Sequence, residues 1–82
     1  MAVAAAWIQA DWIYSRHPYQ NAKFWIDNNW IWGPAGSADV NTKHWIDNNW
    51  IWGPVGAPSV HTGYWIQDGW IYGPDERLPF LS

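Results

Sequence analysis

The sequence predicts an all-β protein made of four tryptophan-rich β-hairpin repeats. The segment WIDNNWIWGP occurs twice, at 25–34 and 45–54, and WIQDGWIYGP at 65–74 keeps the same pattern. The segment WIQADWIY at 7–14 is a fourth and more divergent copy. The copies follow one another at intervals of about 20 residues, which is a period typical of repeat architectures.

The residues of each copy cannot form a helix with one apolar face. At about 100° per residue, Trp25, Ile26, Trp30 and Ile31 would lie on all sides of the helix. Each copy also has a polar break in its middle, and all but the first end in Gly-Pro, which interrupts helices. A hairpin accounts for the same residues, because aromatic and β-branched segments typical of strands lie on both sides of the break.

The polar break predicts a two-residue turn. Asp-Gly at 68–69 is among the strongest signals for a type I′ turn, which requires a positive φ at both central residues, and Asn-Asn at 28–29 tolerates that conformation. Ala-Asp at 10–11 suits the turn poorly. We therefore expect the first hairpin to use another turn or to be a modified end cap.

A two-residue turn fixes which residues face each other across a hairpin. Ile26 then faces Ile31, Trp25 faces Trp32, and Asp27 lies opposite Trp30. A three-residue turn would change these pairs. Because side chains alternate along a strand, one side of each hairpin is β-branched and the other mixes Trp with polar residues. In the third repeat the first side holds Val40, Thr42, His44, Ile46 and Ile51, and the second holds Asn41, Lys43, Trp45, Asp47, Trp50 and Trp52.

The chain of 82 residues is expected to be one domain, 1–82. Its hairpins are predicted at about 4–16, 20–34, 40–54 and 60–74, followed by a tail at 75–82. The array either runs as an open hairpin solenoid or closes into a small barrel or propeller-like ring. The tail contains the apolar segment LPFL at 78–81, which is expected to cap the last repeat or to dock on another subunit.

Composition and charge exclude several partners. The formal net charge is −3 and the four basic residues are scattered, so nucleic acid is not an expected partner. The chain has no cysteine, hence neither a disulfide nor a thiolate metal site. No run approaches the roughly 20 apolar residues of a membrane span. No signal peptide is seen, yet the extracellular surface or a virion is a more natural location for this chain than the cytoplasm.

The sequence contains no recognisable catalytic or metal-binding pattern, so we expect a protein that is not an enzyme and needs no cofactor or metal. Asp27 and Asp47 recur at one repeat position, but Gln9 and Gln67 replace them in the other copies, which is typical of polar residues beside a turn. The three histidines lack the spacing of metal ligands, and no serine lies in a nucleophile motif.

The ten tryptophans are the residues from which a function can be inferred. Each indole has a flat apolar face and an N–H donor that needs a partner when buried. So many donors are hard to satisfy inside a small protein, so we expect several rings to be partly exposed. A periodic row of exposed rings can stack on sugars, can enclose a quaternary ammonium, or can form contacts between subunits.

Aromatic hairpins with this period resemble the choline-binding and related cell-wall-binding repeats. In that family, aromatic residues of neighbouring hairpins form ligand sites along a solenoid. The aromatic positions are more closely spaced in this chain, and the glycine-containing segment that follows them differs. The resemblance implies repeated sites for wall polymers or glycans.

Two functions are therefore expected. The first is a lectin-like, multivalent module that binds surface carbohydrate or cell-wall polymer through stacking platforms. The alternative is a structural assembly protein, such as a virion fibre, decoration or envelope component, in which Trp faces join subunits of a homo-oligomer or larger assembly. The predicted platforms of the first are Trp25, Trp32, Trp45, Trp52, Trp65 and Tyr72.

Overall fold

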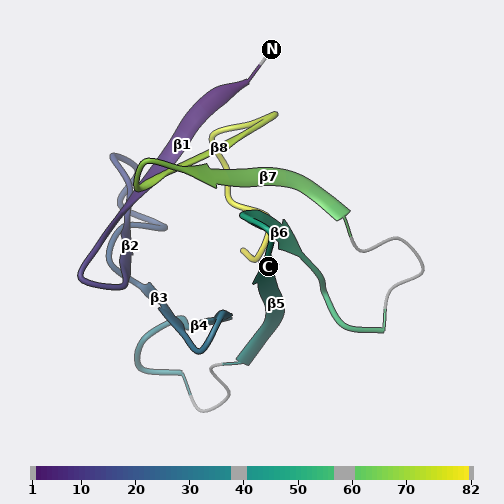
Figure 1. Ribbon diagram of the computed structural model, residues 1–82. Coiled ribbons are helices and arrows are strands. Elements are labelled where there is room, and N and C mark those ends of the chain that lie inside the picture. The colour runs from purple at the N-terminus through teal and green to yellow at the C-terminus, as the bar shows by residue number, and fades with distance from the viewer. Residues whose placement is uncertain (1, 38–40, 57–60, 82) are drawn as a thin grey trace.

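The computed structural model describes residues 2–37, 41–56 and 61–81, which form one closed barrel of eight antiparallel strands (Figure 1). Each strand pairs with its neighbours in chain order, and β8 pairs with β1. The closed form of the predicted hairpin array is thus the one observed. The strands are β1 (Val3–Gln9), β2 (Trp12–Tyr14), β3 (Phe24–Asp27), β4 (Trp30–Trp32), β5 (Asn41–Asp47), β6 (Trp50–Trp52), β7 (His61–Gln67) and β8 (Trp70–Gly73).

The predicted two-residue turns and their register are confirmed. In the second hairpin Ile26 pairs with Ile31 and Trp25 with Trp32. The expectation of a different turn in the first hairpin is wrong, because Ala10 and Asp11 also have positive φ, at 52° and 68°. The first hairpin pairs with neighbours on both sides, so the barrel imposes on it the same strand twist, and hence the same turn, as on the other three.

Neighbouring hairpins are joined in the same way around the whole barrel. The second turn residue of one hairpin accepts a backbone hydrogen bond from the first-strand isoleucine of the next. The Ile46 N–H, for example, donates to the Asn29 carbonyl at 2.7 Å. The donors and acceptors of all four bonds, each 2.7 Å long, are Ile8 to Gly69, Ile26 to Asp11, Ile46 to Asn29 and Ile66 to Asn49. The repeat in the sequence is therefore a repeat around the barrel axis.

The isoleucine side of the hairpins faces the core. The second-strand isoleucines Ile13, Ile31, Ile51 and Ile71 are 0% exposed, and the first-strand isoleucines pack against them. All ten tryptophans lie within the described ranges, and none of them is buried. An eight-stranded barrel has an interior just wide enough for side chains, and these isoleucines share it with larger apolar residues such as Phe24 and Tyr64.

Aromatic rings and glycines fit together at the end of the barrel opposite the turns, where the linkers and termini lie. A Cβ on Gly33 would be 2.6 Å from the Phe24 ring. A Cβ on Gly53 would lie 2.9 Å from the His44 ring, and a Cβ on Gly73 would overlap the Tyr64 ring. Each ring therefore packs directly on a glycine. In the first hairpin Ala6 stands at the ring position and Ser15 at the glycine position, so this copy has no ring that requires a glycine opposite it.

The strict alternation predicted for the third repeat is interrupted beside His44. Pairing shifts between Ile31 with His44 and Trp32 with Asn41, which leaves Thr42 and Lys43 in a bulge. Lys43 has a φ of 66°, and the Thr42 hydroxyl donates to the Ile31 carbonyl at 2.6 Å. A bulge aims side chains differently from a regular strand, which simple alternation does not anticipate. Residues 40 and 60, with which the third and fourth hairpins were predicted to begin, lie outside the described residues.

The C-terminal tail fills the barrel at the linker end, and Figure 1 shows it ending in the middle of the ring of strands. Leu78 is 1% exposed and Phe80 is 6% exposed. The Phe80 ring lies 4.8 Å from the Phe24 ring and 5.9 Å from the His44 ring, between centroids. The tail therefore caps its own barrel, and its buried side chains are not available to another subunit.

A buried glutamine fixes the tail to the linker between β2 and β3. Gln20 is 0% exposed, and its amide nitrogen donates to the Ser15 hydroxyl at 2.9 Å and to the Glu76 carbonyl at 2.8 Å. Its amide oxygen accepts a hydrogen bond from the Leu78 N–H at 3.1 Å. Because a buried amide needs such partners, Gln20 is matched to the folded tail rather than to a ligand.

Candidate aromatic binding surface

The outer surface carries a pair of tryptophans wherever one hairpin meets the next. We call each pair a seam, and the four seams are Trp12/Trp25, Trp30/Trp45, Trp50/Trp65 and Trp70/Trp7. The two members of a seam are directly paired residues of neighbouring strands. Their ring centroids are 5.2, 5.8, 5.5 and 5.7 Å apart, and the rings are tilted by 46°, 52°, 54° and 53° in the same order.

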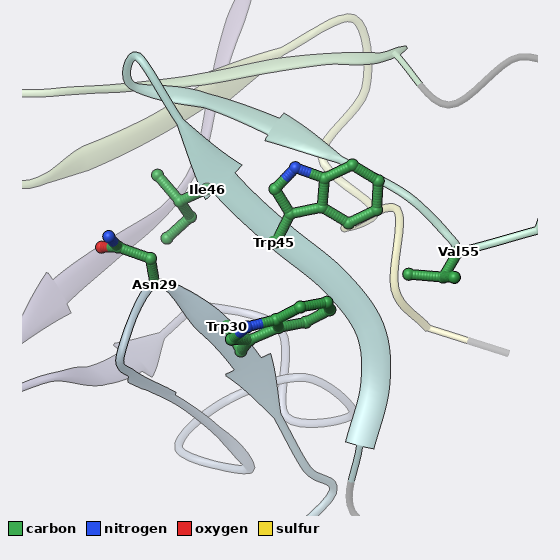
Figure 2. A pocket seen from close by; sticks show the side chains of 5 residues that line it. All are labelled: Asn29, Trp30, Trp45, Ile46 and Val55. Atoms are coloured by element: carbon green, nitrogen blue, oxygen red, sulfur yellow. The ribbon is translucent and has the colours of Figure 1, made fainter.

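The Trp30/Trp45 seam borders a cavity of about 200 Å³ (Figure 2). The two indoles stand on adjacent strands, Val55 lies to one side of them, and Asn29 and Ile46 line the end nearest the turn. The lining thus combines two apolar ring faces with the amide of Asn29. Recognition sites for small polar ligands typically have this composition, a mainly apolar wall with a few polar groups.

Several seam tryptophans are well exposed, which confirms the expectation from their number. Trp12, Trp50 and Trp70, all from second strands, are 37%, 36% and 42% exposed. By contrast, the indoles of Trp32 and Trp52 donate to the carbonyls of Asp27 and Asp47 at 3.2 and 3.1 Å, so their N–H groups are already partnered. The other five seam indoles are half-buried, namely Trp7, Trp25, Trp30, Trp45 and Trp65.

The six residues predicted as platforms all lie on the outer surface and form cross-strand pairs within their hairpins. Trp65 and Tyr72 stack at 5.8 Å with 21° between their planes. The seam partners of Trp25, Trp45 and Trp65 were missed, namely Trp12, Trp30 and Trp50, and so was the seam that closes the barrel, Trp70/Trp7. Trp12, Trp30, Trp50 and Trp70 each follow a predicted turn directly, and this position is visible in the sequence. Their role in the seams could not be inferred from it, because the sequence does not show which strands of different hairpins pair.

The Trp50/Trp65 seam differs from the others through His61. The His61 ring lies 4.7 Å from the Trp50 ring and 4.7 Å from the Trp52 ring. Its Nδ1 accepts a hydrogen bond from the Gly63 N–H at 3.1 Å, so a neutral ring carries its proton on Nε2. This seam therefore has an additional side-chain donor, and the four seams are similar without being identical.

The remaining polar clusters serve the fold. Burial lowers the pKa of His44 below its ordinary value, although a hydrogen bond to the Thr42 carbonyl partly offsets this, and the ring lies inside the barrel. His17 and Arg16 both contact the Glu76 carboxylate, and their hydrogen bonds hold the pKa of Glu76 below its usual range. Within residues 2–37, 41–56 and 61–81, no group of three acidic, histidine or cysteine side chains could hold a metal ion.

The chain was compared with models of protein families, with curated proteins and with solved structures, and none of them matches it. The described ranges also contain no helix with the length and apolar character needed to cross a membrane.

Proposed function

We propose that this protein is a non-catalytic, multivalent recognition module that binds surface carbohydrate or cell-wall polymer outside the cell or on a virion. The observation that carries the proposal is the set of four seams, built alike and facing outward on a barrel whose interior is already filled by isoleucines and the tail. Indole faces that are not needed for the core are available to stack on the C–H faces of sugar rings.

The size of the cavity at the Trp30/Trp45 seam suits one sugar unit. The cavity at Trp30/Trp45, about 200 Å³, is smaller than the roughly 300–1,000 Å³ of pockets that enclose drug-sized ligands. A single shallow contact of this kind is weak. Four of them on one rigid scaffold would gain affinity through a high effective concentration when the ligand is a polymer or a coated surface.

Assembly through the same rings is the second candidate, and the exposure of Trp12, Trp50 and Trp70 favours it. Two arguments for assembly are weakened by the fold. Barrel closure pairs β1 with β8, so these strands are not free to pair with another chain. The apolar tail is buried in its own barrel. Recognition therefore accounts better for the exposed rings.

A polysaccharide and glycan array combined with sedimentation tests the proposal. Wild-type protein is expected to be a monomer that binds at least one glycan class, and Trp45→Ala is expected to weaken this binding while the far-ultraviolet spectrum stays unchanged. Tyr19→Ala is the matched control, because Tyr19 is 48% exposed, lies in the linker between β2 and β3, and has ring contacts with His17 and Arg77. An oligomer without any glycan binding would favour assembly instead.

A further inference from the structure

We propose that the seams bind a polysaccharide whose sugars carry free, protonated amino groups, and that the Trp30/Trp45 seam is its principal site. This inference rests on the proposed function and specifies the class of glycan. It is drawn from the position of the carboxylates relative to the seams.

The turn end of the barrel is acidic, whereas the linker end carries charges of both signs. Every hairpin has one carboxylate at or beside its turn, and within the described ranges this turn end has no basic residue. All four basic residues lie at the linker end or in the tail. The carboxylates of the turn end are Asp11, Asp27, Asp47 and Asp68, and the basic residues are Arg16, Lys23, Lys43 and Arg77. The seam tryptophans lie near the acidic end, which disfavours anionic glycans and favours cationic ones.

The carboxylates on strands flank one seam on both sides. Asp27 pairs directly with Trp30 across the second hairpin, so the two side chains lie on the same outer side. Asp47 follows Trp45 by two residues along β5 and therefore also shares its side. Within the part of the chain that the structure describes, neither carboxylate takes part in an ion pair. Both charges are thus available to a bound ligand.

The other seams provide an internal comparison. At Trp70/Trp7 the two flanking positions are Gln67 and Gln9, which are neutral. Each of the remaining two seams has one aspartate and one glutamine at these positions. Asp11 lies in the turn beside the Trp12/Trp25 seam and Asp68 in the turn beside the Trp70/Trp7 seam, so each of these two seams also has a turn carboxylate nearby. On the strands, Trp30/Trp45 is the seam flanked by two aspartates and Trp70/Trp7 the seam flanked by none.

An amino sugar matches both properties of this seam. The C–H face of its ring can stack on an indole, and its ammonium group can interact with Asp27 or Asp47 and with the π-face of the neighbouring indole. An N-acetylated sugar keeps the ring face and loses the charge. A lysine-rich peptide has the charge and lacks the ring face. These two compounds therefore separate the contributions of charge and stacking.

The test is a calorimetric titration of the protein with a glucosamine hexamer and, separately, with its fully N-acetylated counterpart. Both titrations are carried out at a mildly acidic pH at which the amines are protonated. Wild-type protein is expected to bind the free-amine hexamer more tightly, and added salt should reduce the difference. Asp27→Asn and Asp47→Asn are each expected to weaken this binding by about two- to fivefold, as for exposed ion pairs. Asp75→Asn is the control, because it removes the same charge at the linker end.

Three results would overturn the inference while leaving glycan binding intact: equal affinity for the two hexamers, no effect of Asp27→Asn and Asp47→Asn beyond that of Asp75→Asn, or equally tight binding of a lysine hexapeptide. Failure of the proposed function would look different. In that case neither hexamer binds, and the glycan array is also empty.

Discussion

Removal of the Phe80 ring is expected to destabilise the barrel strongly. Phe80 is 6% exposed and contacts the rings of Phe24 and His44. Truncating a buried Phe to Ala typically costs about 3–5 kcal/mol. Here the ring also borders an open cavity of about 470 Å³, so water can replace part of its volume. We therefore expect Phe80→Ala to lie near the lower limit of that range, at about 3 kcal/mol.

Urea denaturation followed by Trp fluorescence measures this loss. At the roughly 0.05–0.15 kcal/mol per residue typical of folded proteins, the whole domain has about 4–12 kcal/mol of stability, so the shift in midpoint should be large. Leu81→Ala is the control, because Leu81 is only partly buried; we expect it to cost about 1 kcal/mol. If Phe80→Ala costs no more than Leu81→Ala, the tail does not cap the barrel as described.

Three further changes test other parts of the structure. Burial lowers the pKa of His44 below its ordinary value of 6.5, so as the pH falls the unfolded chain is protonated at this residue before the folded chain is. The free energy of unfolding should therefore fall as the pH drops below 6.5, and His44→Phe should lose this part of the pH dependence. Gly53→Ala would place a Cβ 2.8 Å from backbone atoms of Lys43 and His44 in β5, and it should lower the free energy of unfolding by about 3 kcal/mol or more. Gly56 has open space around it, so Gly56→Ala should lower it by only about 1 kcal/mol in the same urea assay. Replacing Ala10 by Asn together with Asp11 by Gly should stabilise the first turn by about 1 kcal/mol, seen as a higher melting temperature, because both residues have positive φ; a lower melting temperature would contradict the shared turn type.

The hairpins could be predicted from the sequence because their determinants are local. Asn28 and Asn29 tolerate positive φ, and the period of two in the flanking strands then fixes Ile26 opposite Ile31. The same alternation defines two sides but does not say which one is buried. That choice depends on how the barrel closes, which turns the isoleucines inward and leaves the indoles outside.

The seams and the tail could not be predicted, because they depend on contacts between distant parts of the chain. Trp30 meets Trp45 only after a linker and the bulge at Thr42 and Lys43. Gln20 contacts Leu78 from 58 positions away. In such cases the sequence shows suitable residue types, but the partner is set by how the barrel closes.

The most direct test of the account is a nitrogen-edited NMR spectrum of the ten indole N–H groups during titration with the glucosamine hexamer. Binding at the seams predicts large, saturable shifts for Trp30 and Trp45, with smaller ones for Trp32 and Trp52, whose N–H groups already donate to carbonyls. Indole signals that stay unchanged at saturating hexamer, or shifts confined to Trp32 and Trp52, would contradict recognition of this glycan through the seams.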